Sequence, residues 1–300
     1  MSAGPGGSES APTIPRLGEA RGCDEGHPLH MPTTQETTWR AGRFWWEGAP
    51  AGPGPGSGCA VRGLVFDLDA LTDIECDGHR VAYNAAFTTH GLDFQWSVPR
   101  YRQLLALTDE RQRVAAELRK RCVATEADVL TKLLADEIYT TKTMLFDELI
   151  LERDLTPRAG LVDFVMDAVG AGVQVAVVVN GQRGWAEPLV RQLVGEGLVE
   201  VVVAAEDIVK PMPDPEAHRH ALWELGLSAD DAFAVTGSAS GLRAANAAGM
   251  PTLVITGEGT PDIPAAVAVR PDYGGTNPLR LVDCQRLHAG WSRSRKPTAA

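Results

Sequence analysis

Residues 61 to 69 read Val61-Arg62-Gly63-Leu64-Val65-Phe66-Asp67-Leu68-Asp69. The apolar run up to Phe66 favours β structure and predicts a buried strand that ends at two carboxylates. Like charges at the tip of a buried strand are costly unless a cation or a proton lies between them. Asp67 and Asp69 are therefore candidates for holding a hard divalent ion, with Asp67 able to attack phosphorus. The alternative is an ordinary helix cap or turn.

Downstream of this strand the hydrophobic period changes twice. From about residue 77 to 153 apolar residues recur at helical spacing, and strand patterns are absent. After Pro157 strands are predicted at 173–179, 199–204, 232–235 and 252–255, and helices at 161–169, 186–195, 216–225 and 241–248. Such alternation is typical of parallel βαβ units. We therefore expect an open α/β sheet with a helical insert after its first strand, and ligands at the carboxyl ends of the strands.

The segment before this strand has a different composition. Residues 1–58 contain 12 Gly and 8 Pro, which predicts a disordered tail and linker. Within it, Trp39-Arg40-Ala41-Gly42-Arg43-Phe44-Trp45-Trp46 gathers four aromatic side chains. This segment is a candidate to dock on the folded body or on a protein partner, and the alternative is a patch with no role.

Charge and composition exclude several classes of function. The 300-residue chain has a formal net charge of −11, which argues against general nucleic-acid binding. No apolar stretch approaches the ~20 residues of a membrane helix, and the first 30 residues carry no secretory pattern. The five cysteines are scattered without a CxxC pair, so neither a zinc site nor a disulfide framework is indicated. We expect a cytoplasmic protein.

Two later segments also follow predicted strands. Lys210 stands in the proline-rich loop Lys210-Pro211-Met212-Pro213-Asp214, where its ammonium group could reach a phosphate as a point charge. A solvated surface lysine is the alternative. The small residues of Thr236-Gly237-Ser238 open the helix predicted at 241–248, and free N–H groups at such a helix start could hold an anion.

Taken together and in order, the motifs resemble those of the haloacid dehalogenase superfamily of phosphohydrolases. More narrowly, residues 61–257 are similar to the branch that contains β-phosphoglucomutase and the CbbY sugar-bisphosphate phosphatases. The pieces that carry the resemblance are Phe66-Asp67-Leu68-Asp69, Glu75 with Gly78-His79-Arg80-Val81-Ala82-Tyr83-Asn84-Ala85-Ala86-Phe87, Lys142-Thr143, Pro157-Arg158-Ala159-Gly160, Lys210-Pro211-Met212-Pro213-Asp214, and Gly241-Leu242-Arg243-Ala244-Ala245-Asn246-Ala247-Ala248-Gly249-Met250. The resemblance implies a Rossmann-like core over 59–75 and 156–285, and an α-helical cap over 76–155.

The resemblance also implies roles for individual residues. Asp67 would be the nucleophile and first Mg²⁺ ligand, and Asp69 the general acid and base, with its backbone carbonyl on the metal. Lys210 would neutralise the phosphoryl oxygens and the nucleophile. The residues expected to contact a small phosphorylated metabolite are His79, Arg80, Arg113, Lys142, Asn180, Gly181 and Ser238.

Several positions depart from the family pattern. Ala70 replaces the glycine after the second aspartate, and one residue is missing before Glu75. Val179 stands where a hydroxyl is usual, with the amide of Asn180 as a candidate substitute. Thr236-Gly237 replaces an acidic pair that includes a Mg²⁺ ligand. Mg²⁺ affinity should therefore drop, because such sites rely on carboxylates.

Other substitutions bear on the same question. Glutamate and aspartate side chains that could replace the missing ligands are Glu206, Asp207 and Asp73. In the cap, Asp109 and Glu110 stand where glycines are usual, and their charges would repel a phosphate dianion.

Two interpretations of function follow. The first is a Mg²⁺-dependent phosphatase, with a phosphomutase less favoured, that acts on a small sugar phosphate through an aspartyl-phosphate and has weakened activity. The second is a catalytically impaired pseudo-hydrolase that binds a phosphorylated ligand or a protein partner. In a third, weaker interpretation, the tail recruits another protein to an active or inactive core.

Overall fold

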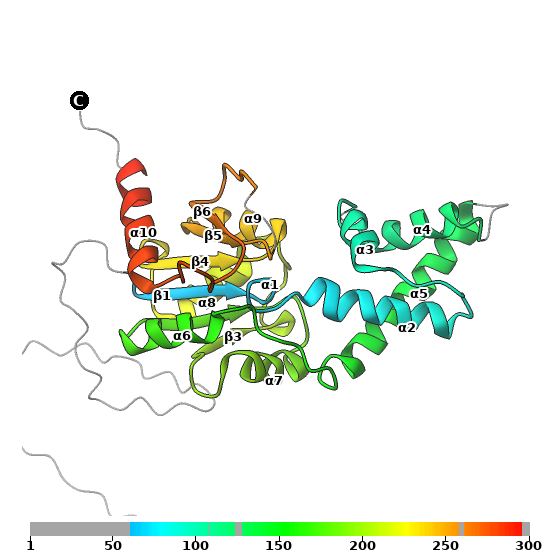
Figure 1. Ribbon diagram of the computed structural model, residues 1–300, viewed down its shortest axis with the longest axis horizontal. Helices are drawn as coiled ribbons and strands as arrows, with labels where there is room; N and C mark the ends of the chain where they lie inside the picture. Colours follow the sequence, from blue (N-terminus) through cyan, green and yellow to red (C-terminus); the bar gives the residue numbers. More distant parts are fainter. Residues whose placement is uncertain (1–60, 108, 124–127, 258–260, 296–300) are drawn as a thin grey trace, which may run out of the picture. The chain divides into compact units, whose positions relative to one another are not determined.

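The computed structural model (Figure 1) describes residues 61–107, 109–123, 128–257 and 261–295. The predicted tail and the Trp39–Trp46 segment lie outside these residues. Within the described part of the chain, none of the helices combines the length and the hydropathy that crossing a membrane would require.

The centre of the fold is a six-stranded sheet with the order β3-β2-β1-β4-β5-β6. Its strands are β1 (Gly63–Asp67), β2 (Gln174–Val178), β3 (Val201–Val203), β4 (Ala232–Thr236), β5 (Thr252–Ile255) and β6 (Ala268–Arg270). All neighbouring pairs are parallel. Every residue of β1 is buried because the sheet is covered on both faces. The predicted α/β sheet is confirmed.

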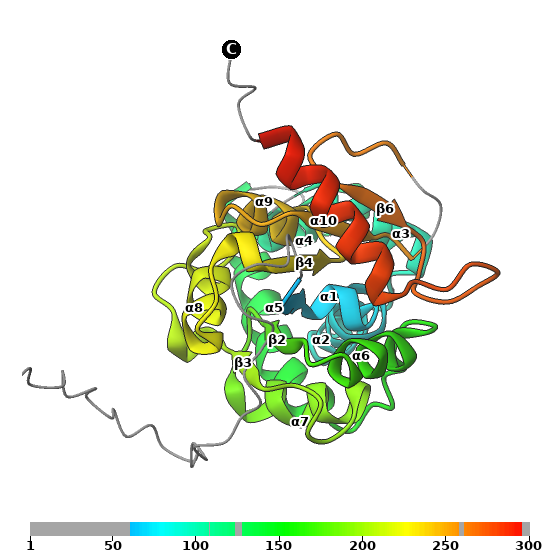
Figure 2. The same cartoon turned by 90° about the vertical axis from the view of Figure 1, so that its left-hand side faces the viewer.

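Helices cover both faces of the sheet (Figure 2). Residues of α6 (Leu161–Gly170), α7 (Arg183–Val194) and α10 (Leu281–Arg295) belong to one buried cluster with β1 and β2 side chains. Residues of α8 (Glu216–Leu225) and α9 (Ala239–Ala247) belong to a second cluster. The short elements of this part are α1 (Leu68–Leu71), η2 (Ala205–Asp207) and η3 (Ala229–Asp231).

The insert after β1 is helical, as the sequence predicts, and consists of η1 (Ile74–His79), α2 (Arg80–Thr89), α3 (Val98–Leu104), α4 (Glu110–Lys120) and α5 (Asp128–Leu149). It has its own cluster of buried side chains, in which Trp96, Tyr83 and Tyr101 are fully buried. A separate core supports the predicted division into core and cap, which stays a prediction. The segment before α2 is a π-helix, a form that accommodates one extra residue and often occurs at functional sites.

The strand order places the candidate site. β1 lies between β2 and β4, and the chain moves outward from β1 in both directions. Ligands of open α/β sheets bind at such a switch point, outside the carboxyl ends of the strands. Asp67 ends β1 and Thr236 ends β4, so both side chains lie at this point.

Candidate active site

Asp67 is the last residue of β1 and the N-cap of α1. Its carboxylate is 1% exposed, and the atom Oδ1 accepts hydrogen bonds from the backbone N–H of Ala70 at 2.9 Å and of Gly237 at 3.0 Å. The atom Oδ2 accepts from the hydroxyls of Thr236 and, at 3.2 Å, Ser238. Four donors of the chain therefore occupy both oxygens of the predicted nucleophile.

A glycine makes this arrangement sterically feasible. A Cβ atom at Gly241 would lie 2.0 Å from Asp67 Oδ2 and 2.2 Å from Thr236 Oγ1. The first turn of α9 can therefore approach the carboxylate only because position 241 has no side chain. Burial raises the pKa of Asp67, and the four hydrogen bonds oppose that rise.

Asp69 lies two residues further on, is half-buried, and lines a cavity. Burial, together with the charges of Asp67 and Glu75, raises the pKa of Asp69 well above its usual range. A rise in pKa moves this carboxyl toward the protonated form, which is the form that a general acid uses. The backbone carbonyl of Asp69 accepts a hydrogen bond from Arg158 Nε at 2.9 Å.

A magnesium ion at this site would need free oxygen ligands. Both oxygens of Asp67 and the carbonyl of Asp69 already accept hydrogen bonds from the chain. A Cβ at Gly237 would lie 2.3 Å from the Asp69 carbonyl oxygen, so no carboxylate can extend from this position without a shift of backbone. Within residues 61–107, 109–123, 128–257 and 261–295, no group of three or more His, Cys, Asp and Glu is placed to hold a metal. The residues present do not fit Mg²⁺.

The three carboxylates considered as replacements are engaged elsewhere, and none lines the cavity. Glu206 accepts from the backbone N–H of Arg183 at 3.0 and 3.1 Å. Asp207 pairs with the Arg183 guanidinium and accepts from Ala204 N at 2.8 Å. Asp73 caps η1 and pairs with Arg102 at 3.4 Å. Replacement of the lost ligands by these residues is not observed.

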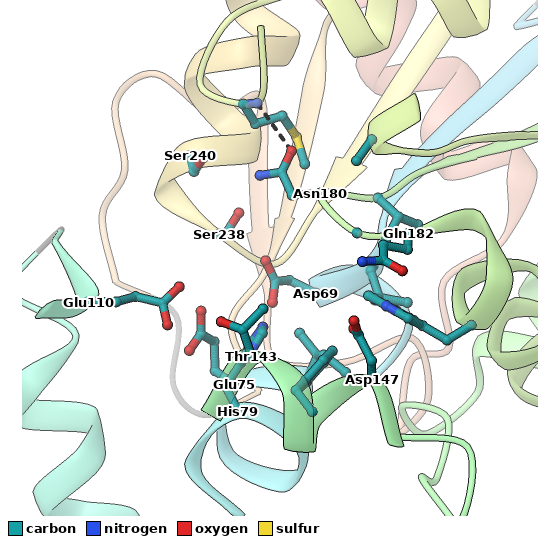
Figure 3. A pocket seen from close by; sticks show the side chains of 18 of the residues that line it. Asp69, Glu75, His79, Glu110, Thr143, Asp147, Asn180, Gln182, Ser238 and Ser240 are labelled. Carbon is teal, nitrogen blue, oxygen red and sulfur yellow. Dashed lines mark hydrogen bonds between the residues drawn. The ribbon is translucent and has the colours of Figure 1, made fainter. Parts of the chain in front are cut away.

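The cavity beside Asp69 has a volume of about 510 Å³ (Figure 3). Side chains from the strand ends and from the insert line it together. Of the predicted site residues, those in its lining are Asp69, His79, Arg113, Lys142, Asn180, Gly181 and Ser238. The structure thus brings seven of the ten predicted residues to one cavity.

The other three predicted residues, Asp67, Arg80 and Lys210, do not line the cavity. Arg80 donates to the backbone carbonyls of Cys76 at 2.9 Å and Trp96 at 3.1 Å, which makes it a structural residue here. Lys210 is exposed, and within the described chain it forms no ion pair with Asp67 or Asp69. Convergence of Lys210 with the two aspartates stays a prediction from the sequence.

The insert contributes two carboxylates, Glu110 and Glu75, that were not among the ten predicted site residues. Glu110 Oε2 accepts hydrogen bonds from Lys142 Nζ and from Tyr83 Oη, both at 2.7 Å. Glu75 Oε2 accepts from Tyr101 Oη at 2.7 Å and lies 4.0 Å from Arg113 Nη1. Burial alone would raise the pKa of Glu110, but the charge and hydrogen bond of Lys142 outweigh it and lower the pKa to about 2.

Two further lining residues could have been found from helical spacing. Phe146 and Asp147 lie one turn after Lys142 and Thr143, on the face of α5 that lines the cavity. The His79 ring stacks on Phe146 with centroids 4.3 Å apart. Burial lowers the pKa of His79 to about 4, so this ring is neutral at physiological pH.

Sequence comparison relates this chain to one family of hydrolases. The family model described as haloacid dehalogenase-like hydrolase matches residues 61–249. Protein CbbY from Cereibacter sphaeroides is 33% identical over 200 residues, which cover 66% of this chain and 85% of that protein.

Solved structures of CbbY are also similar to this chain. The crystal structure of CbbY from Rhodobacter sphaeroides with phosphate has a TM-score of 0.57 at 28% identity, covering 74% of this chain and 99% of the other. A mutant of that protein in complex with xylulose-(1,5)bisphosphate has a TM-score of 0.54 at 28% identity, covering 72% and 97%.

Proposed function

The chain belongs to the haloacid dehalogenase-like hydrolases, in the branch that contains CbbY, and from this we propose a phosphatase of weakened activity that acts on a small sugar phosphate. Relatives in this branch support the assignment to phosphoric monoester hydrolases. The observation that carries the proposal is the presence of Asp69, with its raised pKa, in a cavity of about 510 Å³ beside Asp67. The CbbY structures in complex with phosphate and a sugar bisphosphate suggest the substrate class.

The proposed reaction uses Asp67 as nucleophile. A carboxylate oxygen of Asp67 attacks phosphorus, the P–O bond to the sugar breaks, and the leaving oxygen takes the proton of Asp69. Water then attacks the aspartyl-phosphate, Asp69 accepts the proton of that water, and phosphate leaves. For the first step Asp67 Oδ2 must give up its hydrogen bonds with Thr236 and Ser238.

Asn180 is the candidate to bind a phosphoryl oxygen. Its Oδ1 accepts from Met212 N at 3.2 Å, and within the described chain its Nδ2 makes no hydrogen bond. The amide N–H groups are therefore available in place of the hydroxyl that Val179 lacks. Hydrolases of this superfamily generally use Mg²⁺. The proposed steps do not involve the ion, because the residues at Asp67 and Asp69 do not fit it.

The proposal implies slow turnover. Loss of one oxyanion donor costs roughly 10²–10³ in rate, and a misplacement near 1 Å costs about 100-fold. From a typical kcat of about 10 s⁻¹, turnover falls to roughly 10⁻³ s⁻¹ or less. This still exceeds the uncatalysed hydrolysis of phosphate monoesters.

A second candidate function is a pseudo-hydrolase that binds a phosphorylated metabolite without useful turnover. The specific observation in its favour is that four donors of the chain occupy Asp67, which does not line the cavity. A protein partner for Trp39–Trp46 stays a prediction from the sequence.

Phosphoenzyme trapping distinguishes the two candidates. The wild-type chain is incubated with a panel of sugar phosphates, and phosphate release and intact mass are followed. We expect release at about 10⁻³ s⁻¹ or below, unchanged by a chelator, and one phosphoryl group on the peptide that contains Asp67. Release with no label on Asp67 contradicts the proposed mechanism. Ligand binding with neither release nor label favours the pseudo-hydrolase.

A further inference from the structure

The charges on the insert side of the cavity bear on how many phosphate groups the ligand can carry. This inference rests on the proposed function. The two cations in the lining are Arg113 and Lys142, so a second phosphate would depend on them. Lys142 is 4% exposed, and its Nζ is 2.7 Å from Glu110 Oε2. The nearby carboxylate offsets the charge of this buried ammonium, so the net attraction of the pair for another anion is weak.

The guanidinium of Arg113 also has partners within the chain. Its Nε donates to the carbonyl of Leu107 at 2.7 Å, and its Nη1 lies 4.0 Å from Glu75 Oε2. The side chain is 9% exposed, so the guanidinium has little freedom to turn toward a ligand. Each cation of the lining thus has its own carboxylate partner.

Glu110 keeps its charge when the cavity is empty. Its pKa of about 2 leaves it ionised at physiological pH, and Tyr83 Oη donates to the same oxygen that Lys142 contacts. Two donors therefore hold the Glu110 carboxylate beside Lys142. A phosphate that approached Lys142 would therefore also approach this carboxylate.

A third carboxylate has no counterion. Asp147 lines the cavity and, within the described chain, forms no hydrogen bond or ion pair. Figure 3 shows its carboxylate reaching from α5 into the cavity. Apart from Asp69, the lining has three carboxylates, Glu75, Glu110 and Asp147, against two cations. A second phosphate dianion would therefore enter a region of net negative charge.

We propose that this cavity selects sugar monophosphates and rejects sugar bisphosphates, and that Glu110 is the specificity-determining residue. Its carboxylate neutralises Lys142 and repels a second phosphate, which is discrimination by an unfavourable contact with the wrong ligand. Uncharged hydroxyl groups of the sugar can still bind at this end, where Glu75, Glu110 and Asp147 are acceptors.

The test is calorimetric binding of glucose 6-phosphate and of glucose 1,6-bisphosphate, which does not require turnover. We expect the wild-type chain to bind the monophosphate at least about tenfold more tightly. Glu110→Gln should remove this preference, because bisphosphate binding should strengthen about tenfold or more relative to monophosphate binding. Asp147→Asn, as a second variant, should shift the ratio in the same direction.

A matched control removes a carboxylate outside the cavity. Asp136 pairs with Arg111 at 2.9 Å on the exposed surface of the insert, and Asp136→Asn should leave both affinities unchanged. Equal or tighter bisphosphate binding by the wild type, or a ratio unchanged in both cavity variants, overturns the specificity proposal alone. Absence of binding for both ligands in every variant overturns the proposed function and this inference with it.

Discussion

The Asp67→Asn variant is expected to melt roughly 6–12 °C below the wild-type chain. The amide NH₂ of the new side chain would take the place of Oδ2, so the Thr236 and Ser238 hydroxyls lose their carboxylate acceptor and must turn round to accept instead. Hydrogen bonds to a charged group contribute about 1.5–3 kcal/mol each, and a loss of about 3 kcal/mol in total corresponds to the shift given, at roughly 2–4 °C per kcal/mol. Differential scanning calorimetry measures it.

The neighbouring aspartate is the matched control. The raised pKa of Asp69, caused by burial and by the charges of Asp67 and Glu75, favours the neutral acid, which an amide resembles in size and charge. Asp69→Asn should therefore melt within about 2 °C of the wild type. Replacing a functional residue often increases the stability of a protein. A rise in Tm for Asp67→Asn, or equal losses for the two variants, would contradict the structural role of Asp67.

The second large effect concerns the lost metal ligand. Gly237→Asp returns a carboxylate to the end of β4, but its Cβ would lie 2.3 Å from the Asp69 carbonyl oxygen and 2.8 Å from Asp69 Cβ. Because the carbonyl oxygen belongs to the backbone and the Cβ is fixed directly to it, neither atom can turn aside. We therefore expect a loss of about 2–4 kcal/mol in the free energy of unfolding and no gain in hydrolysis with Mg²⁺.

A different glycine provides the comparison. A Cβ at Gly184, in the first turn of α7, meets nothing within 4 Å, so Gly184→Ala should be neutral or stabilise by up to about 1 kcal/mol. Chemical denaturation of both variants measures the difference. If Gly237→Asp folds as stably as the wild type and hydrolyses sugar phosphates faster with Mg²⁺, the site is an open metal site that lacks one ligand, and the account is wrong.

The sequence predicted the sheet well because its strands are buried, apolar and punctuated by helices. The helix at 216–225 and the strand at 252–255 have the bounds that were predicted. Apart from the short elements α1, η2 and η3, the elements of the core that were missed are β6 and α10. β6 has three half-buried residues at the edge of the sheet, too few for a pattern. α10 buries only Leu281, Cys284 and His288 among polar neighbours, and it continues past the predicted end of the core at residue 285.

The site was predicted in part, for a physical reason. Asp69, His79 and Lys142 occupy positions fixed by the end of a strand or by a helix face, and such positions can be inferred from spacing. The directions of Arg80 and Lys210 depend on rotamers and on contacts with distant segments, which spacing does not encode. The loss of acidic residues at Thr236-Gly237 was visible in the sequence. The sequence did not show that the remaining hydroxyl and N–H groups donate hydrogen bonds to Asp67, which lies 169 to 171 residues earlier in the chain.

The central claim is that hydrogen bonds within the chain occupy Asp67 and Asp69 and leave no site for Mg²⁺. The most direct test is to titrate Mg²⁺ into the wild-type chain by calorimetry and to record the melting temperature at each concentration. A ligand at 100 times its Kd stabilises the folded state by about 2.7 kcal/mol, which is an easily measured rise in Tm. The account predicts no heat of binding and an unchanged Tm at millimolar Mg²⁺. Saturable binding that raises Tm in the wild type and disappears in Asp67→Asn would contradict it.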